Sequence, residues 1–539
     1  MKKVAILRFS LPLVLIGLLV VGCNETSNSN GNDVRSIDGS GNNLQKPLMG
    51  ATFTELVRYV FSEYEDGISE MSEAGRPSAR LVSNIVSSQE ESIPNTLNAS
   101  DYIWQWGQFL DHDIDLTDGA NPAEAANISV PAGDHYFDPL DTGTQVISFN
   151  RSVYNTLTGT GIDNPRQQMN KITSWIDASN VYGSDVVRAV ALRTNDGTGR
   201  LATSAGNLLP FNIQGLPNDG GDDDPFLFLA GDFRSNEQVG LTSMHTLFVR
   251  EHNRYVQNLA AQNPGLNGDE LYERGRRFVG ALMQVITYSE FLPALLGQGA
   301  ISAYTEYNPN VDASIANIFS TAGYRFGHSM LSTEILRLDQ NLNEIPEGNL
   351  PLRDAFFSPE LLTDEGGIDP ILRGLAKQLS QKVDPFIVND VRNFLFGPPG
   401  AGGFDLAALN IQRGRDHGLP YYNDVREQMG LSRVESFQDI SSDPDIQMRL
   451  EDAYGDVNKI DLWTGGLAED PVLGSHLGEL FHFIVVEQFK ALRDGDRFWY
   501  HHDLSGSELE EVQSTRLSDV VRRNTDIGFE LQDDVFRVQ

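Results

Sequence analysis

Apolar residues recur at intervals of three and four along most of the chain, the spacing that places them on one face of an α-helix. Segments with this spacing begin at Thr54 ("TELVRYVFSEY"), Asp269 ("DELYERGRRFVGALMQVITYSEFLPALL") and Ser475 ("SHLGELFHFIVVEQFKAL"). Another, "TSMHTLFVREHNRYVQNLA", begins at Thr242, a residue type that caps helix N-termini. Strand signals such as "TQVISFN" are few and short. The pattern predicts a mainly α fold.

The N-terminal residues follow a different pattern. A basic start with Lys2, Lys3 and Arg8 precedes an apolar run that ends in "VVGC" at Cys23, which is the form of an export signal. The end of this run resembles the bacterial lipobox, in which the cysteine is acylated and becomes the mature N-terminus. A transmembrane anchor is the alternative, but the run is short for a membrane span. We therefore expect a signal peptide at residues 1–22 and a lipid anchor at Cys23, which would hold an exported protein on the bacterial cell envelope or the extracellular surface.

Residues 23–46 are rich in Asn, Ser and Gly and have little apolar content, so we expect a flexible tether there. No second tether and no repeat follows, which predicts one large helical domain over residues 47–539. Cys23 is the only cysteine, so an intramolecular disulfide is excluded. The net charge of −35 argues against a nucleic-acid partner, because phosphates would be repelled.

The stretch "WGQFLDHDID" places polar side chains among bulky apolar ones. On a helix, Gln108 and His112 share one face and Asp111 lies beside them. Asp113 is rotated by about 100° from His112 and points elsewhere. The helix either has an exposed polar side, as polar residues usually do, or presents these groups to two separate sites.

Three further segments combine charged residues with a histidine or an amide. "AGDFRSNEQVG" supplies Arg234 and Glu237, and "AGYRFGHSMLS" supplies Arg325 and His328 on one helical face. "LNIQRGRDHGLPYYN" supplies Asn410 and Arg413. Each segment alone is compatible with an ordinary salt-bridge network.

Together and in this order, the segments resemble the animal-type haem peroxidases of the peroxidase–cyclooxygenase superfamily, most closely the peroxidasin-like members. The resemblance extends from "SARLVSNIV" (78–86) to "RDGDRFWY" (493–500). It implies an enzyme with haem b that reduces hydrogen peroxide. The expected electron donors are small anions, namely bromide, iodide and thiocyanate, or aromatic molecules.

The resemblance also implies roles for residues on the peroxide side of the haem. His112 matches the histidine that takes a proton from peroxide and returns it to the leaving oxygen, which requires a base with a near-neutral pKa. Arg234 matches the arginine whose permanent charge stabilises the developing anion. Gln108 matches the glutamine that orients water or a halide.

On the opposite side, His328 matches the iron ligand, and Asn410 would accept a hydrogen bond from its other ring nitrogen. Arg325 and Arg413 have the charge to pair with the haem propionates.

Asp111 and Glu237 match carboxylates that the family esterifies to haem methyl groups. Glu237 is followed by Gln238 rather than the methionine that forms a sulfonium link. We therefore expect no sulfonium link and no efficient chloride oxidation.

The segment "TSWIDAS" explains Asp113. With Asp113, it matches the calcium site of the family: carboxylates from Asp113 and Asp177, hydroxyls from Thr173 and Ser179, and carbonyls from Thr173 and Trp175. Calcium takes about 6–8 oxygen ligands, and this set reaches the lower end. A Ser/Thr-rich turn without metal is the alternative.

Two other functions compete with peroxidase activity. A fatty-acid oxygenase of the cyclooxygenase branch needs a tyrosine three residues before the iron ligand, but this position is Arg325. A haem-free, calcium-binding surface or adhesion protein would suit the tether and the acidic surface, but it would not need both histidines and Arg234.

Overall fold

A computed structural model describes residues 33–221 and 224–539, so the expected signal peptide and Cys23 lie outside the described residues. Residues Arg35–Gln539 form one compact unit. Its longest helices are α2 (Tyr102–Ile114), α5 (Val239–Gln262), α6 (Gly268–Ile286) and α16 (Glu479–Asp494). The mainly α prediction is confirmed.

Shorter elements complete the unit. The other α-helices are α1 (Ala79–Val86), α3 (Ser179–Tyr182), α4 (Val186–Ala191), α7 (Leu292–Leu296), α8 (Asn317–Thr321), α9 (Glu360–Thr363), α10 (Asp369–Lys377), α11 (Asn389–Arg392), α12 (Leu406–Asp416), α13 (Tyr422–Gln428), α14 (Pro444–Tyr454), α15 (Leu462–Ala468), α17 (Tyr500–Asp503), α18 (Gly506–Ser514) and α19 (Leu517–Asn524). Tighter 3₁₀ turns are η1 (Ala205–Asn207), η3 (Gly323–Ser329), η4 (Leu352–Asp354), η5 (Phe437–Asp439) and η6 (Val457–Lys459), and η2 (Thr287–Phe291) is a π-helix. The strands form antiparallel pairs: β1 (Thr54–Glu55) with β4 (Met169–Asn170), β2 (Ile128–Ser129) with β3 (Val146–Ile147), and β5 (Glu334–Ile335) with β6 (Leu350–Pro351).

Three of the four predicted helices are present. The segment from Asp269 forms α6, η2 and α7, and the segment from Ser475 forms α16. The segment from Thr242 forms α5, but this helix begins earlier, because Gln238 rather than Thr242 caps it by accepting from the Gly240 N–H. The predicted strand near Val146 is β3.

The predicted helix over residues 54–64 is wrong. Leu56, Val60 and Tyr64 are buried at a helical interval, as the pattern required. However, the backbone there bonds to distant segments: the Leu56 N–H donates to Gln168 O and the Val57 N–H to Ile315 O. Three apolar side chains packed on a surface can have this spacing without a helix, because tertiary hydrogen bonds replace the local ones.

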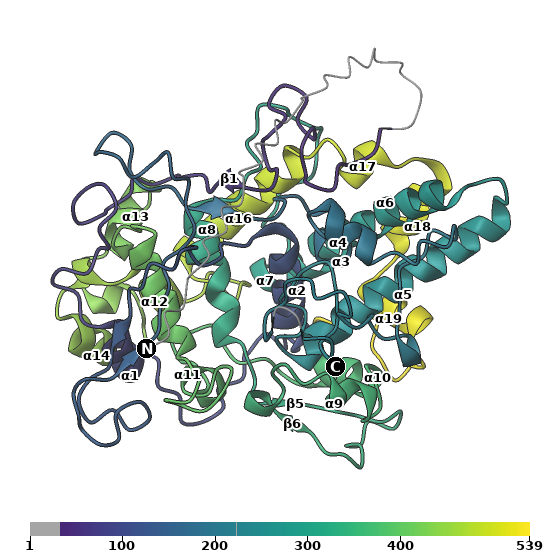
Figure 1. Ribbon diagram of the computed structural model, residues 1–539. Helices are drawn as coiled ribbons and strands as arrows, with labels where there is room; N and C mark the ends of the chain where they lie inside the picture. Colours follow the sequence, from purple (N-terminus) through teal and green to yellow (C-terminus); the bar gives the residue numbers. More distant parts are fainter. Residues whose placement is uncertain (1–32, 222–223) are drawn as a thin grey trace, which may run out of the picture. The chain divides into compact units, whose positions relative to one another are not determined.

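Gly268–Leu296 is the one helical run in the described residues that is long and apolar enough to cross a membrane. Of its most apolar 18-residue window, 78% is buried inside the folded unit, which is typical of a core helix. In Figure 1 this run lies beside α5, with which α6 makes extensive contact. Its apolar composition therefore serves packing.

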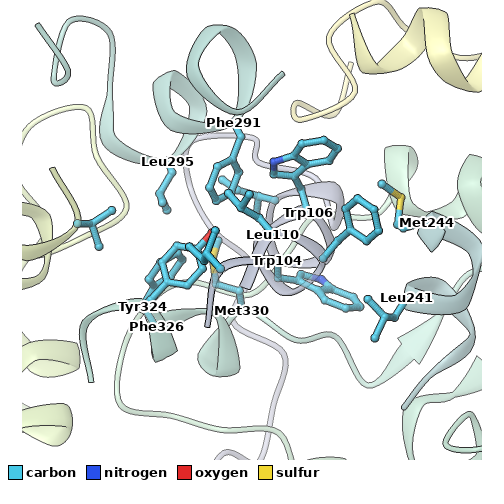
Figure 2. Close-up of a cluster of buried hydrophobic side chains, with 14 of the residues drawn as sticks. Trp104, Trp106, Leu110, Leu241, Met244, Phe291, Leu295, Tyr324, Phe326 and Met330 are labelled. Carbon is cyan, nitrogen blue, oxygen red and sulfur yellow. The ribbon is translucent and has the colours of Figure 1, made fainter. Parts of the chain in front are cut away.

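Helix α2 lies at the centre of the fold, where it contacts α3, α5, α10 and η3. Figure 2 shows Trp106 and Leu110 of α2 within an apolar cluster that includes Met244 of α5. The start of α5 approaches α2 so closely that a Cβ at Gly240 would lie 2.4 Å from the Gln105 Oε1. This contact places the residues before α5 against the polar face of α2.

The expected tether is wrong for residues 35–46, which pack on the folded unit. Arg35 forms an ion pair with Asp496 at 2.8 Å, and the Asn42 side chain donates to the same carboxylate at 2.7 Å. The Asn43 side chain donates to Pro309 O. Polar side chains, rather than apolar ones, hold this segment in place. Its low apolar content was therefore a poor guide to whether it is ordered.

Candidate functional site

Helix α2 is enclosed by protein except along one narrow face. Its side chains are buried apart from Gln108 and Asp111, which are partly exposed and lie three residues apart. His112 is next to Asp111 and is only 3% exposed. The polar residues predicted to share a face thus line the open side of a buried helix.

Arg234 and His112 meet at a carboxylate that the sequence analysis did not single out. Asp232 accepts hydrogen bonds from Arg234 Nε and Nη2, both at 2.9 Å. The Asp232 Oδ1 also lies 3.6 Å from His112 Nδ1, which has no hydrogen-bond partner. Asp232 therefore lies between the two side chains and fixes the arginine through a fork of two bonds.

These contacts determine which groups are charged. Burial and the nearby Arg234 hold the pKa of His112 well below its usual value, so the ring is neutral but less basic than the near-neutral pKa expected from its role. Burial alone would raise the pKa of Asp232, but the charge and hydrogen bonds of Arg234 outweigh it and hold that pKa well below its usual range. The open side of α2 thus has a neutral imidazole beside a permanently charged guanidinium.

Asp111 and Glu237 are the other carboxyl groups on this face. Burial, assisted by the charge of Asp115, raises the pKa of Asp111 to about 7, although Arg234 and Arg325 oppose the shift. Burial raises the pKa of Glu237 to about 8. The Gln108 side chain donates to Glu237 Oε2 at 2.8 Å, which joins α2 to the segment before α5.

His328 and Arg325 lie on η3, which contacts α2. In a 3₁₀-helix, residues three apart eclipse each other, so these two side chains point the same way. Both are partly exposed, as is Gly327, whereas Tyr324 and Phe326 beside them are buried. A Cβ added at Gly327 would meet no atom within 4 Å, so open space borders His328.

Asn410 of α12 contacts His328 as predicted, with 2.7 Å between its amide nitrogen and the histidine Nδ1. Its oxygen accepts from Arg325 Nη1 at 3.1 Å, so the amide is turned opposite to the expected orientation. A half-turn of the amide would exchange the two contacts. Burial and the charge of Arg325 lower the pKa of His328 to about 3, which keeps the ring neutral, as metal ligation requires.

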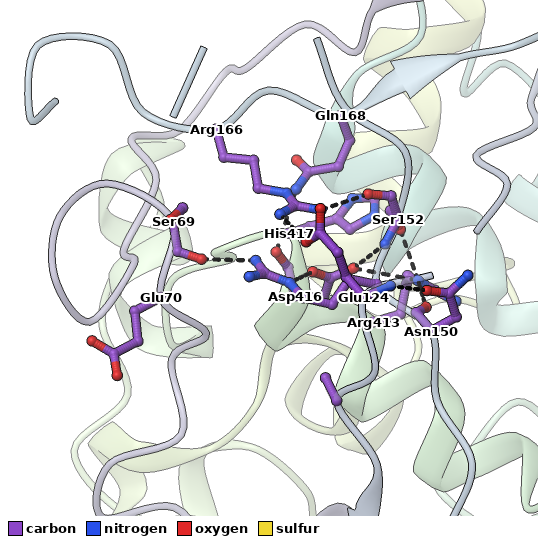
Figure 3. A network of polar contacts seen from close by, with 12 residues as sticks. Ser69, Glu70, Glu124, Asn150, Ser152, Arg166, Gln168, Arg413, Asp416 and His417 are labelled. Atoms are coloured by element: carbon purple, nitrogen blue, oxygen red, sulfur yellow. Dashed lines mark hydrogen bonds and ion pairs between the residues drawn. The ribbon is translucent and has the colours of Figure 1, made fainter. Parts of the chain in front are cut away.

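Arg413 of α12 belongs to a polar network, shown in Figure 3. Its Nη1 donates to Asn150 O and Ser152 Oγ and pairs with Asp416 at 3.3 Å. Burial lowers its pKa to about 10, although Asp416 opposes the shift, and Arg325 lowers it further. Two guanidinium groups thus lie near each other, and Arg325 has no carboxylate within 4 Å in the described part of the chain. Two added carboxylates would suit this place.

The residues predicted to contact haem therefore share one property. The following side chains are partly exposed on elements that are otherwise mainly buried: Gln108, Asp111, Arg234, Glu237, Arg325, His328 and Arg413. We call this set, together with the neighbouring His112, the open face. It offers a neutral imidazole, space beside Gly327 and cations for propionates, so the residues present fit a haem.

The predicted calcium ligands also come together. Asp113 is buried behind the open face and accepts from the backbone N–H groups of Asp177 and Ala178, both at 3.1 Å. The Thr173 hydroxyl donates to Asp177 Oδ1 at 3.2 Å, and the Ser179 hydroxyl donates to Asp113 O at 2.8 Å. Side-chain and backbone oxygens of this loop and of α2 thus cluster in one place.

The charges of this loop are incompletely balanced. The Asp177 Oδ2 has no hydrogen-bond partner, and the nearest cation, Arg276, is 3.7 Å away. Burial raises the pKa of Asp113 to about 8, and the neighbouring Asp177 adds to the shift. No group of three or more His, Cys, Asp or Glu residues in the described chain could hold a metal. The predicted set has only two carboxylates, so this result leaves it untested. A hard cation fits such an oxygen set.

Sequence reasoning missed two supporting residues. Asp232 precedes Arg234 by two positions, and this proximity of opposite charges was the available signal. Gln238 donates to Gln105 Oε1 at 2.7 Å and to Gln108 Oε1 at 3.1 Å, and it caps α5. In the sequence, Gln238 was noticed only because it stands where a methionine would form the sulfonium link.

Known proteins are similar to this chain over most of its length. The model of the animal haem peroxidase family matches residues 34–536. The chain belongs to the animal haem peroxidase family. Peroxinectin A of Dictyostelium discoideum is 36% identical over 97% of this chain and 99% of its own length. The peroxidasin homologue of Mus musculus is 38% identical over 94% of this chain.

The match covers only 37% of that peroxidasin homologue, so the chain spans just over a third of its length. Among solved structures, peroxidase A from Dictyostelium discoideum superposes with a TM-score of 0.88 at 35% identity, covering 94% of this chain and all of the other. A fatty acid alpha-dioxygenase from Arabidopsis thaliana gives a TM-score of 0.78 at 22% identity over 94% of this chain and 83% of the other, which shows the shared fold alone.

Proposed function

We propose that this member of the animal haem peroxidase family reduces hydrogen peroxide and oxidises bromide, iodide, thiocyanate or small aromatic donors. The observation that carries the proposal is the open face, where side-chain contacts link partly exposed polar residues of separate elements. Arg234, before α5, lies 3.6 Å from Asp111 of α2, and Asn410 of α12 contacts both Arg325 and His328 of η3. Bound haem supplies the iron at which the peroxide O–O bond is cleaved.

On the α2 side, neutral His112 takes a proton from peroxide and returns it to the departing oxygen as water. Arg234 places a permanent charge beside that oxygen, and Asp232 holds the guanidinium in position. Gln108, held between Glu237 and Gln238, orients water or a small anion.

On the η3 side, neutral His328 offers a ring nitrogen to iron while Asn410 holds the other nitrogen. With the amide turned to accept, Asn410 would make the imidazole a stronger donor to the metal. Arg325 and Arg413 would bind the two propionates, whose negative charge would oppose the burial that lowers the pKa values of both arginines.

Three further features belong to the proposal. Asp111 and Glu237 would be placed to esterify haem methyl groups, with hydrogen peroxide as the two-electron oxidant, supported by their place on the open face and their tendency to remain protonated. Calcium binds Asp113, Thr173, Trp175, Asp177 and Ser179, supported by the unpaired carboxylate oxygen there. Acylated Cys23 anchors the exported protein to a membrane, supported by the lipobox-like sequence.

The test is haem-supplemented expression followed by a donor series with hydrogen peroxide. We expect a Soret band and peroxide-dependent oxidation of bromide, iodide and thiocyanate, with far slower oxidation of chloride. His328→Ala should lose the Soret band while its far-ultraviolet circular dichroism stays unchanged. A wild-type protein that binds haem but consumes no peroxide with any donor would refute the proposal.

The fatty-acid oxygenase alternative gains no support from the contacts. Arg325 occupies the position where that chemistry needs a tyrosine. The nearby Tyr324 is only 6% exposed and is stacked on Phe319 at 4.7 Å between ring centroids. Oxygen uptake with linoleate in the absence of peroxide would favour the oxygenase.

A further inference from the structure

A row of aromatic side chains leads from η3 to the partly exposed helix α17. Tyr324 lies 5.7 Å from Phe489, and Phe489 lies 6.1 Å from Tyr288 of the π-helix, measured between ring centroids. Tyr288 lies 4.8 Å from Trp499, which lies 4.6 Å from Tyr500. These five residues, here called the aromatic row, are in successive ring contact although they come from four separate segments.

The two ends of the row have different surroundings. Tyr324 is buried in the apolar cluster of Figure 2, and it lies four residues before His328, close enough to Asp111 for that carboxylate to affect its pKa. At the other end Trp499 is 2% exposed, while Tyr500 is half-buried and His501 is exposed. The row therefore connects the neighbourhood of the open face with solvent.

Most residues of this row can give up a single electron. Tyrosine and tryptophan are the side chains that a strong oxidant converts to radicals most readily, whereas phenylalanine can only bridge. Electron tunnelling falls off exponentially with distance, so consecutive ring contacts favour transfer in short steps. The sequence has no cysteine after Cys23 that could compete as an electron source.

Proton release decides where an oxidised residue can persist. The Tyr324 hydroxyl is buried without a hydrogen-bond partner, and the Tyr288 hydroxyl donates to the carbonyl of Phe489, which cannot take up a proton. Trp499 can lose an electron while it keeps its N–H. Tyr500 can release its proton to water or to His501, whose ring lies 4.2 Å away.

Building on the peroxidase function proposed above, we infer that the aromatic row carries single electrons inward, so that Trp499 and Tyr500 form a second oxidation site at the surface. The donors it would serve are phenols too large to reach the open face. A phenol matches Tyr500 chemically, so the exchange of an electron and a proton between the two is nearly balanced.

The overall reaction conserves atoms and electrons. One hydrogen peroxide takes up two electrons and two protons, its O–O bond breaks, and two waters form. Two phenol molecules each lose one electron through Tyr500 and one proton to solvent, and they leave as phenoxyl radicals. Hydrogen peroxide is thus the oxidant for both sites.

The test compares a small and a large donor in the haem-loaded protein. Bromide reaches the open face, whereas tyramine coupled to a large dextran can react only at the surface. In Trp499→Phe we expect bromide oxidation within about twofold of wild type and dextran–tyramine oxidation reduced at least tenfold. Tyr500→Phe, at a half-buried position that tolerates substitution better, should give the same separation.

Tyr255→Phe is the matched control. Tyr255 is also half-buried and stacked on a phenylalanine, Phe278, at 4.0 Å, and its hydroxyl also donates a hydrogen bond, but it lies outside the aromatic row. This variant should oxidise both donors at the wild-type rate.

A second readout does not depend on turnover. Wild-type protein treated with one equivalent of peroxide and a nitroso spin trap should yield a trap adduct on Tyr500 in peptide mass spectra, and Trp499→Phe should lose this adduct. Wild-type adduct levels and dextran–tyramine rates in Trp499→Phe would overturn the inference. Absence of peroxide-dependent bromide oxidation in wild type would instead overturn the proposed function.

Discussion

Two arginines of this protein, the buried Arg80 and the partly exposed Arg325, have opposite surroundings. Arg80 in α1 is fully buried and pairs with Asp134 and Asp405, each at 2.7 Å. It also donates to the Asn393 side chain and to Arg392 O, so each guanidinium nitrogen has a partner.

Within the described part of the chain, Arg325 donates only to Ser320 O and Asn410 Oδ1, and burial lowers its pKa although Asp111 and Asp115 oppose the shift. An arginine whose hydrogen-bond donors are all satisfied by the protein holds elements together. An arginine with unsatisfied donors is available to bind a ligand. The number of satisfied hydrogen bonds therefore distinguishes Arg80 from Arg325, although both are arginines.

The largest effect should come from the open face itself. His112→Ala removes the base that moves the peroxide proton, so we expect the rate of peroxide reduction to fall by about 10²–10⁴-fold. Stopped-flow absorbance of the haem after mixing with peroxide measures this step. The melting temperature should stay near the wild-type value. Equal rates in both proteins would show that His112 is not the base.

Arg80→Met should give the opposite result. Removing the cation leaves Asp134 and Asp405 buried without a partner, so we expect the free energy of unfolding to fall by about 3–5 kcal/mol. Urea denaturation followed by circular dichroism measures the loss. Bromide turnover per bound haem should be unchanged, and a selective loss of turnover would remove the distinction between the two arginines.

Arg325→Gln should affect haem affinity but hardly the stability of the apoprotein. The charge-assisted bonds to a propionate are each worth about 1.5–3 kcal/mol, so haem should dissociate at least about tenfold faster. Transfer of haem to excess apomyoglobin measures the rate, in protein that has not been exposed to peroxide and so carries no ester links. A large drop in the melting temperature of the apoprotein would show that Arg325 has the structural role assigned here to Arg80.

The calcium loop should give a smaller, pH-dependent effect. Without calcium, burial raises the pKa of Asp113 to about 8. The folded, calcium-free protein therefore keeps a proton on Asp113 at pH values where the unfolded chain, with its ordinary pKa, has released it. The stability of the apoprotein therefore falls as pH rises from about 4 to 8. Calcium replaces this proton, so EDTA should lower the melting temperature more at pH 8 than at pH 5. Asp113→Asn should abolish the difference.

The sequence predicted most of the long helices and the contact between Asn410 and His328. It did not predict the residues that hold the site residues in position. Local periodicity was sufficient for α5, α6 and α16, where the apolar stripe is long. It failed over residues 54–64, because distant backbone groups supply the hydrogen bonds there.

Family motifs singled out His112, Arg234, His328 and Asn410, because each of them lies within a short local motif. Asp232 and Gln238 were missed, because their roles depend on contacts between α2 and the segment before α5. The orientation of the Asn410 amide follows from its contact with Arg325, which the sequence does not reveal.

The packing of residues 35–50 determines where the protein can be truncated. The Trp175 indole donates to Gly39 O at 3.0 Å, and a Cβ at Gly50 would lie 2.7 Å from the same ring. A recombinant domain that starts at Pro47, where the apolar content begins, would uncover one side of this tryptophan and remove Arg35 from the vicinity of Asp177. Trimming the N-terminus to aid crystallisation would therefore loosen the loop behind the base at position 112, and Asp33 or Val34 is the safer first residue.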